Sequence, residues 1–442
     1  MQGRHLGTDP ARSRRILLGI TLGYGTLIVV LLAFIALRLW GEEDLAHYRE
    51  VRAFVEETYA GDTNRDELLQ SALVGMLDEL DPYSRYYPPQ ESLRMERETR
   101  GIFKGIGVVF RDTPADEFRG QILFPLPETP AQRAGLEVGD RIVAVDGTTI
   151  EELGLPGLRA SLNTPGQEAV ELLLEDLSGG RRKASIVPEK LTDPSVRRQR
   201  LLADKPELAH LSLLSFSRKT PAEVDRALAS LTEGGMTGLI LDLRRNHGGV
   251  LDAAVAIARR FVAEGTIVST EGRGEVEVFK ALPAEATYAG LPLVVLVDED
   301  SASASEVLAA ALQENGAAEL VGTPTYGKGT VQTIRRFRDH GTVAKVTSAH
   351  YFTPSHRNLE RSSDPERDYG LLPDHGVELT DEEREHIHRW LGRYSPPATQ
   401  RAALKAWEEA AGLSLLPEQP PDRQLERAIT VLERLLKQAT AR

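Results

Sequence analysis

Three serines alternate with alanines in the stretch VDEDSASASEVLAAALQ, which begins at Val297. A serine hydroxyl can act as a nucleophile if a nearby base takes its proton. The helical pattern that follows would place the middle serine, Ser303, at a helix N-terminus, where free N–H groups can stabilise an oxyanion. Ser303 and Glu306 also match the S-x-x-E capping box, which offers the same serine an ordinary structural role.

No histidine is near these serines in the sequence, so a lysine is the candidate base. Lys328 lies between Gly327 and Gly329, which allow close approach of the backbone and leave the amine unobstructed. Burial can lower the pKa of such a lysine until it accepts a proton, although a solvent-facing lysine is the structural alternative. The G-x-x-x-x-G-K pattern of a phosphate loop also ends at Lys328, but Gly329 replaces the Ser or Thr that binds Mg²⁺, which argues against nucleotide binding.

The elements around these residues follow an α/β pattern from residue 191 onward. The strand-like runs LAHLSLLSFS, TGLILDLRRN and LPLVVLVDE alternate with the helical runs TPAEVDRALASLTEGG and HGGVLDAAVAIARRF. Such alternation predicts a mostly parallel sheet, whose strands end at one rim where sites gather. The Gly248-Gly249 turn and the serine cluster both follow strands, so we expect them to share that rim.

A smaller β-rich region precedes this one, over residues 101–190. Its segment PAQRAGLEVGDRIVAVDG resembles PDZ domains, in which a short helix leads through Gly-Asp into a central strand. Gly105, Ile106, Gly107 and Val108 stand where such domains bind the C-terminal carboxylate of a peptide, which implies protein or peptide partners with apolar C-termini. A Gly-rich hairpin is the alternative for Gly105 and Gly107. Residues 41–100 show two helical patterns broken at GDTN.

The N-terminus predicts a membrane anchor. The stretch from Ile16 to Leu37 has no charge, and as a helix it would rise about 33 Å, enough to cross a bilayer. Arginines precede it and GEED follows Trp40, which favours a cytoplasmic tail over residues 1–15, an anchor over residues 16–40 and an extracytoplasmic remainder, periplasmic or extracellular, at a bacterial-type cell membrane. A cleaved signal peptide is the alternative. Paired glycines in the span leave a homo-oligomer open.

Composition excludes several classes of protein. Lys and Arg number 53 against 66 Asp and Glu, a formal net charge of −13, which argues against a nucleic-acid partner. The chain has no cysteine, so thiol catalysis, disulfides and Cys-ligated metals are absent. The H-E-x-x-H spacing of a zinc site is also absent, and we expect neither a metal nor a cofactor.

Taken in order, these motifs resemble the carboxy-terminal processing proteases, PDZ-containing serine peptidases of the tail-specific type in family S41. The resemblance runs from LDPYSRYY through the PDZ-like segment, LILDLRRNHGG, SASASE and YGKGTVQT to the C-terminal PDRQLERAITVLERL. It implies Ser303 as nucleophile, Lys328 as base and Gln332 as the residue that orients the lysine. It also implies an oxyanion site made by the backbone N–H groups of Gly249 and Ala304.

The same resemblance implies the architecture of the chain. We expect an α/β multidomain protein with a ClpP/crotonase-like protease core over residues 191–380, into whose chain the PDZ-like domain at 101–190 is inserted. A helical region at 41–100 precedes them, and a helical segment at 381–442 follows. The apolar face of the last helix, at Leu425, Ala428, Val431, Leu432 and Leu435, is suited to packing or to dimerisation.

Several features depart from the family pattern or test it. His247 stands where proline commonly precedes the Gly-Gly pair, and a polar insert runs from Arg361 to Asp368. The proposed pair Lys328 and Gln332 would lie roughly 13 Å apart on a strand but about 5–6 Å apart over a helical turn, so we expect a turn although TVQTI looks like strand. A PDZ adaptor with an inactive protease domain and a crotonase-like acyl-CoA enzyme are the alternative functions.

Overall fold

The computed structural model describes residues 43–100, 102–111, 120–162, 169–361, 369–412 and 419–441. The tail and the anchor expected over residues 1–15 and 16–40 lie outside the described residues, as does most of the insert at 361–368. Among the residues that are described, no helix has the length and apolar character needed to cross a bilayer. The chain divides into two compact units at the bond between Leu80 and Asp81.

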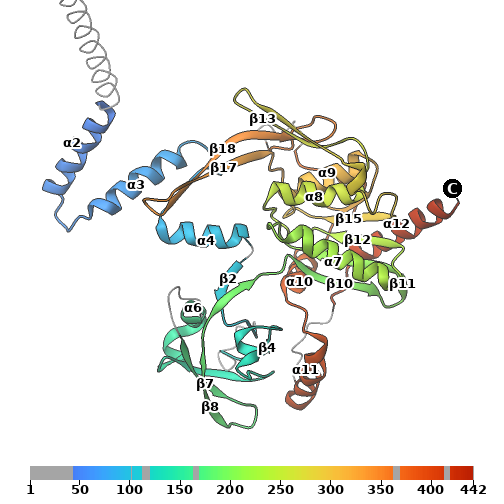
Figure 1. The fold of residues 1–442 in the computed structure, drawn as a ribbon, viewed down its shortest axis with the longest axis horizontal. Coiled ribbons are helices and arrows are strands. Elements are labelled where there is room, and N and C mark those ends of the chain that lie inside the picture. Colours follow the sequence, from blue (N-terminus) through green and yellow to red (C-terminus); the bar gives the residue numbers. More distant parts are fainter. Residues whose placement is uncertain are drawn as a thin grey trace, which may run out of the picture. The chain divides into compact units, whose positions relative to one another are not determined.

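The first unit contributes two helices, α2 (Glu43–Thr58) and α3 (Arg65–Asp78) (Figure 1). The break between them falls at the GDTN sequence, where the Asn64 side chain accepts a hydrogen bond from the Asp66 N–H and so caps α3. Leu77 is the only buried residue of α3. These helices therefore bury little apolar surface in this structure.

The PDZ-like region of the second unit has three small antiparallel sheets, which pair β2 with β9, β3 with β4, and β6-β5-β7-β8 in that order. Ile122, Ile142, Leu158 and Leu172 are among its fully buried core residues. The elements are β2 (Ile102–Gly105), β3 (Val108–Phe110), β4 (Ile122–Pro125), α5 (Pro130–Arg133), β5 (Arg141–Val145), β6 (Thr148–Thr149), α6 (Ile150–Leu162), β7 (Val170–Glu175), β8 (Arg181–Ile186) and β9 (Glu189–Thr192).

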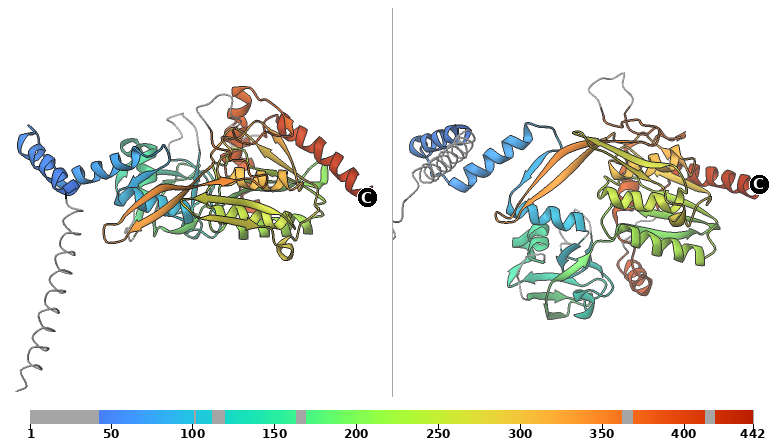
Figure 2. Two further views of the ribbon diagram at one scale, coloured as in Figure 1. Left: turned by 90° about the horizontal axis from the view of Figure 1, so that it is seen from above. Right: turned by 45° about the horizontal axis from the view of Figure 1, so that its top comes forward.

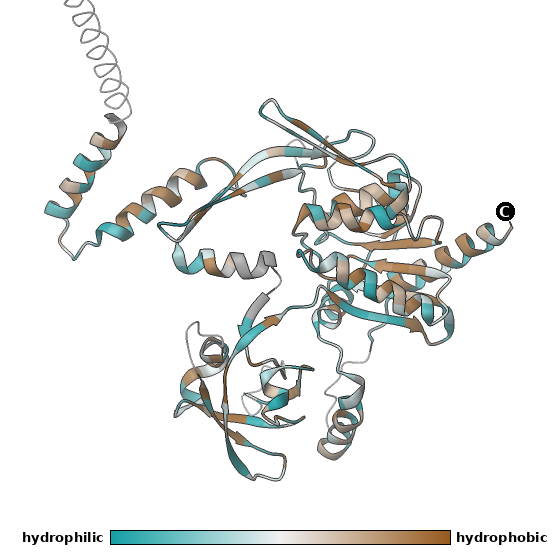
Figure 3. Cartoon of the chain, viewed as in Figure 1, coloured by the Kyte–Doolittle hydropathy of each residue, from teal (hydrophilic) through white to brown (hydrophobic). Residues whose placement is uncertain are grey.

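The protease-like region is built on a six-stranded sheet in the order β10-β11-β12-β15-β16-β19, in which β10 is antiparallel and the rest are parallel. This confirms the predicted α/β alternation. The strands are β10 (Val196–Leu202), β11 (Lys205–Leu213), β12 (Gly238–Asp242), β15 (Leu293–Val297), β16 (Glu319–Gly322) and β19 (His375–Gly376). Figure 3 shows β15 and the middle of β12 as hydrophobic, because helices cover both faces of the sheet.

Successive residues of β12 point to opposite faces and so belong to different cores. Leu239 and Leu241 pack with α7 (Thr220–Glu233), α8 (Leu251–Phe261) and α9 (Ala304–Glu314). Ile240 packs on the other side, against the apolar face of α12 (Arg423–Thr440). The sequence left packing and dimerisation open for the apolar face of α12, and the structure shows it packed on the chain's own sheet.

A second, antiparallel sheet contains β18 (Thr342–Phe352), which pairs along one edge with β17 (Thr330–Phe337) and along the other with β1 (Arg85–Tyr87) and β13 (Thr266–Gly272). Figure 2 shows β17 and β18 as a long hairpin. Strand β14 (Val276–Lys280) extends the sheet beyond β13. The remaining helices are α4 (Pro89–Arg100), the short 3₁₀ helix η2 (Pro283–Glu285), α10 (Asp381–Gly392) and α11 (Ala398–Ala411).

Helix α11 packs against the PDZ-like region rather than against the six-stranded sheet. Leu404 and Trp407 of α11 form an apolar cluster with Leu123 and Phe124 of β4. The Gln400 side chain donates a 3.0 Å hydrogen bond to the carbonyl oxygen of Pro125 in the same strand. The C-terminal segment therefore contacts both regions of the second unit.

Candidate active site

Ser303 lies at the N-cap of α9 with φ 57° and ψ −116°. A positive φ of this kind is costly for any residue with a side chain and is found mainly at functional sites. The Ser303 N–H donates a 2.8 Å hydrogen bond to Oε2 of Glu306, which holds this backbone in place. Ser303 itself is partly exposed, whereas its neighbours Ala302 and Ala304 are buried.

The two flanking serines have structural roles. Both are fully buried. The Ser301 hydroxyl donates to the carbonyl oxygen of Leu243 at 2.9 Å, and the Ser305 hydroxyl donates to the carbonyl oxygen of Asn246 at 2.7 Å. They therefore tie the nucleophile loop to the loop that follows β12.

The loop after β12 places a glycine turn against Ser303. Gly248 has φ 93°, and a Cβ at this position would lie only 2.9 Å from the Ser303 Cβ, so no other residue fits without a shift. The Asn246 side chain accepts a 2.9 Å hydrogen bond from the Gly248 N–H and fixes the turn. The backbone N–H groups of Gly249 and Ala304 make no hydrogen bond within the described part of the chain. Two free donors beside a nucleophile suit an oxyanion.

Asp298 joins these two loops from the end of β15. Its carboxylate accepts hydrogen bonds from the Arg245 N–H at 3.0 Å, the Ser301 hydroxyl at 3.1 Å and the Asp300 N–H at 3.1 Å. His388 of α10 lies 2.6 Å from the same carboxylate. A single buried side chain thus orients both the turn and the serine loop.

Arg244, close to the glycine turn in the chain, is buried, and its charge is paired with carboxylates. Its guanidinium donates to Asp242 at 2.7 Å and to Asp422, the N-cap residue of α12, at 2.8 Å. His210 lies 3.0 Å from the Asp242 carboxylate. Sequence reasoning missed this cluster, because Asp422 is brought to Arg244 only by the fold.

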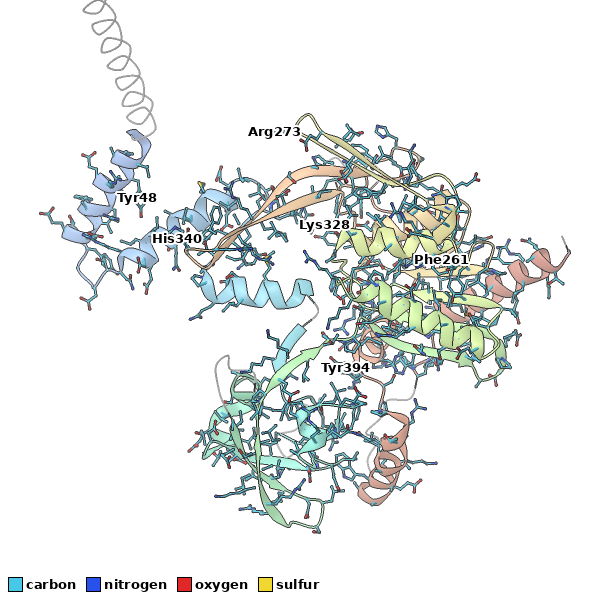
Figure 4. All side chains as sticks on the ribbon, in the orientation of Figure 1. Tyr48, Phe261, Arg273, Lys328, His340 and Tyr394 are labelled. Carbon is cyan, nitrogen blue, oxygen red and sulfur yellow. The ribbon has the colours of Figure 1, made fainter. Side chains whose placement is uncertain are left out.

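Glu306 connects the nucleophile helix to the loop that carries Lys328. Besides Ser303, its buried carboxylate accepts hydrogen bonds from the Thr325 hydroxyl at 2.6 Å, the Gly327 N–H at 2.8 Å and the Lys328 N–H at 2.9 Å. Lys328, labelled in Figure 4, is thereby tied to α9 through its backbone. The residue read from the sequence as half of a capping box therefore also positions the candidate base.

Lys328 has the electrostatic setting expected of a base. Burial lowers the pKa of its amine below the usual value, and the neighbouring ammonium of Lys345 lowers the pKa further. Its Nζ lies 4.7 Å from the centre of the Tyr83 ring. Within the described residues, however, Lys328 makes no hydrogen bond to Ser303.

The helical turn expected from Lys328 to Gln332 is wrong for this conformation. Gln332 belongs to strand β17, which begins at Thr330, and its side chain donates a 2.9 Å hydrogen bond to the Thr330 hydroxyl. The β-branched residues of TVQTI favour a strand, and pairing with β18 satisfies its backbone. The pairing register shifts between Val331 and Gln332, which marks a β-bulge or similar irregularity at this point.

Tyr351 of β18 is a further residue at the site. Its hydroxyl is buried near the Ser303 hydroxyl, although no hydrogen bond of full geometry joins the two. Burial raises the pKa of Tyr351 well above its usual value, the carboxylates of Glu306 and Glu360 raise the pKa further, and the Ser303 hydroxyl acts in the opposite direction. The nucleophile therefore faces a tyrosine here, a neighbour that no sequence motif indicated.

The PDZ-like loop from Gly105 to Val108 leaves two backbone N–H groups free, those of Ile106 and Gly107, within the described residues. The carbonyl oxygens of Ile106 and Gly107 accept hydrogen bonds from Ala131 and Leu126 at 2.8 Å each. Gly107 has φ 84°, and a Cβ there would lie 2.4 Å from that of Thr129. Gly105 and Val108 end and begin the flanking strands.

Comparison with known proteins matches both regions. Residues 207–377 match the model of peptidase family S41, and residues 125–176 match a PDZ domain. A carboxyl-terminal-processing protease from Synechocystis sp. is 38% identical over 329 residues, which cover 71% of this chain and 72% of that protein. The chain belongs to peptidase family S41. It is a carboxyl-terminal processing serine protease with a PDZ domain, as the sequence resemblance implied.

Two further relatives have the same description. A carboxy-terminal-processing protease from Bartonella bacilliformis is 30% identical, covering 76% of this chain and 75% of the relative. The carboxy-terminal processing protease CtpA of Bacillus subtilis is 31% identical, covering 74% and 67%. In this protease Ser303 and Ala304 lie against Gly248, the residue before Gly249, whereas Gln332 is bonded to Thr330. His247 is exposed beside the glycine turn.

Proposed function

We propose that this protease cleaves protein substrates through an acyl-enzyme on Ser303, with Lys328 as general base and Gln332 as the residue that orients it. The observation that carries the proposal is the strained Ser303 backbone beside two free N–H donors, at Gly249 and Ala304. The lowered pKa of Lys328 supports its role, because only the neutral amine can accept a proton. The parallel sheet and its helical layers support a ClpP/crotonase-like core.

In the proposed reaction, neutral Lys328 takes the proton of the Ser303 hydroxyl as Oγ attacks the scissile carbonyl carbon. The oxygen of the tetrahedral intermediate becomes negative and accepts hydrogen bonds from Gly249 and Ala304. The C–N bond then breaks, and the Lys328 ammonium returns its proton to the leaving amine. Water then attacks the ester carbonyl carbon and gives a proton to Lys328, which is neutral again. The C–O bond to Ser303 breaks, Lys328 returns that proton to Oγ, and the new carboxylic acid leaves and ionises.

This chemistry requires β17 to rearrange near its first residues, since Lys328 and Ser303 share no hydrogen bond in the resting conformation described here. The register shift between Val331 and Gln332 is a weak point in the pairing with β18. We place the rearrangement there. It would release the Gln332 side chain from Thr330 and let it reach Lys328.

The PDZ domain would supply recognition. Free N–H groups at Ile106 and Gly107 suit the terminal carboxylate of a substrate, and the substrate's last residues would add a strand beside β3. Apolar C-termini fit such a groove. The uncharged sequence from Ile16 to Leu37 supports a single-pass membrane anchor with the catalytic region outside the cytoplasm, and the glycines of that span support a homo-oligomer.

The test compares wild type with Ser303→Ala, Lys328→Ala and Gln332→Ala on an unfolded protein that carries an apolar C-terminal tail. We expect no cleavage by the first two variants and a severe loss in the third. Mass spectrometry of trapped wild-type enzyme should find the acyl group on Ser303. Cleavage by Lys328→Ala at the wild-type rate would refute the proposed base.

A further inference from the structure

The segment before β1 is fixed to β18 by a tight hydrogen-bonded turn. The Asp81 carboxylate accepts hydrogen bonds from the Tyr83 N–H at 2.7 Å and the Ser84 N–H at 2.8 Å. It also accepts from the hydroxyls of Ser84 at 2.7 Å and Thr347 at 3.1 Å. The Thr347 N–H donates to the buried Ser84 hydroxyl at 3.0 Å. The backbone of Tyr83 therefore has little freedom.

This turn directs the Tyr83 ring at the candidate base. The Lys328 Nζ lies 4.7 Å from the ring centre, within the range of a cation–π interaction. Within the described residues, Lys328 has no ion pair with any carboxylate. The face of Tyr83 is thus the contact made by its ammonium.

Other charges act on the same amine from greater distance. Lys345 of β18 disfavours the ammonium, whereas Glu360 after β18, Glu306 of α9 and Asp81 favour it. Glu360 is itself bonded to the Gly329 N–H at 2.7 Å, and Glu306 has four donors of its own. Neither carboxylate is free to replace the ring as the immediate partner of Lys328.

We infer that Tyr83 is a positioning residue for Lys328, whose ring binds the protonated amine in the resting protease and so sets how readily the base becomes neutral. The inference rests on the proposed role of Lys328. It gives a function to the LDPYSRYY sequence, which the sequence resemblance left without one. Removing the ring removes a stabilising contact of the ammonium only, because a neutral amine gains little from the ring face.

The test measures kcat/KM against pH for cleavage of a fluorogenic peptide with an apolar C-terminus. In Tyr83→Leu the acid limb of the profile should move to lower pH, and kcat/KM on that limb should rise about threefold to tenfold, the factor expected of one cation–π contact. Tyr83→Phe keeps the ring face and should keep the wild-type limb. Tyr87→Leu, in the same segment but beside Arg85, is the matched control and should also leave the limb in place.

An unmoved limb in a folded Tyr83→Leu protein would overturn the inference, as would an equal shift in Tyr87→Leu. If Tyr83→Leu does not fold, Tyr83→Met fills similar space without a ring face and is judged by the same criterion. Lys328→Ala separates the two claims. If it is inactive while the Tyr83 variants leave the limb unmoved, the inference fails and the proposed function stands; if it is active, the proposed function fails.

Discussion

The two halves of the proposed active site, named for the proposed nucleophile Ser303 and the proposed base Lys328, differ in how completely they are formed. The nucleophile half, residues 242–249 and 298–306, is mostly buried, and hydrogen bonds cross-link its two loops, which follow β12 and β15. In the base half, residues 328–332, the two side chains proposed for catalysis have other partners: Lys328 lies over Tyr83 and Gln332 bonds to Thr330. The backbone around Ser303 is therefore already held in one arrangement, whereas Lys328 and Gln332 must exchange their present contacts before the proposed reaction.

The difference follows from where each half lies in the fold. The nucleophile half stands on buried parallel strands and a helix N-terminus, which leave its backbone few alternatives. The base half begins a two-stranded hairpin with exposed residues and a register shift, and such elements open at lower free energy. Substitutions in the first half should therefore reduce both stability and activity, whereas those in the second should reduce activity alone.

Glu306→Gln should have the largest effect. Each Glu306 oxygen accepts two hydrogen bonds, so an amide NH₂ in place of either oxygen would face two donors. Leaving such buried donors unpaired costs about 2–4 kcal/mol in the free energy of unfolding. We expect kcat/KM to fall more than about a hundredfold, which denaturant unfolding and peptide cleavage would measure. A variant as stable as wild type would show that this carboxylate does not hold the nucleophile half together.

Gln332→Ala should show the opposite pattern. The side chain is half-buried and, among the described residues, has one hydrogen bond, to Thr330. Its loss should therefore change the free energy of unfolding by less than about 1 kcal/mol. Activity should fall about tenfold to a hundredfold, because the lysine would lose the partner proposed to orient it. The exposed neighbour Thr333→Ala, which bonds to Ser348, is the control for the strand itself. Equal loss of activity in both variants would contradict a specific role for Gln332.

The sequence predicted the nucleophile half better than the base half. Ser303, the Gly248-Gly249 turn and the α/β alternation all follow from local patterns that the fold preserves. The apolar face of α12 was visible in the sequence, but the sheet beneath it was not. For TVQTI, the local β propensity predicted a strand, whereas the geometry implied by the family resemblance predicted a helical turn. The structure has the strand. Tyr83 and Asp422 reach their partners only through tertiary structure, which no motif encodes.

His388→Gln should have a small effect, because several other hydrogen bonds hold the nucleophile half in the same arrangement. His388 lies 2.6 Å from the Asp298 carboxylate, which keeps its bonds from Arg245, Ser301 and Asp300 without it. We expect a loss of about 0.5–1.5 kcal/mol in stability and less than about threefold in kcat/KM. His386→Gln, exposed on the same helix, is the control. A tenfold loss with the fold intact would show that α10 is needed to orient the nucleophile half.

Lys328→Met should have the smallest effect on stability, and its sign depends on pH. Since burial lowers the pKa of Lys328 in the folded protein, the folded state binds fewer protons than the unfolded state between that lowered pKa and the usual value of 10.5. Below this window the ammonium destabilises the fold in full, and the penalty declines as the pH rises toward 10.5. Removing the charge should therefore stabilise the protein at neutral pH, by about 0.5 kcal/mol after allowance for solvent screening, and by less at higher pH.

Thermal unfolding at several pH values would measure this, with the exposed Lys280→Met as a control that should show no such trend. A variant less stable than wild type at neutral pH would mean that the attraction of Tyr83 and the nearby carboxylates for the ammonium outweighs its desolvation. The contacts of Lys328 would then stabilise the resting conformation of residues 328–332.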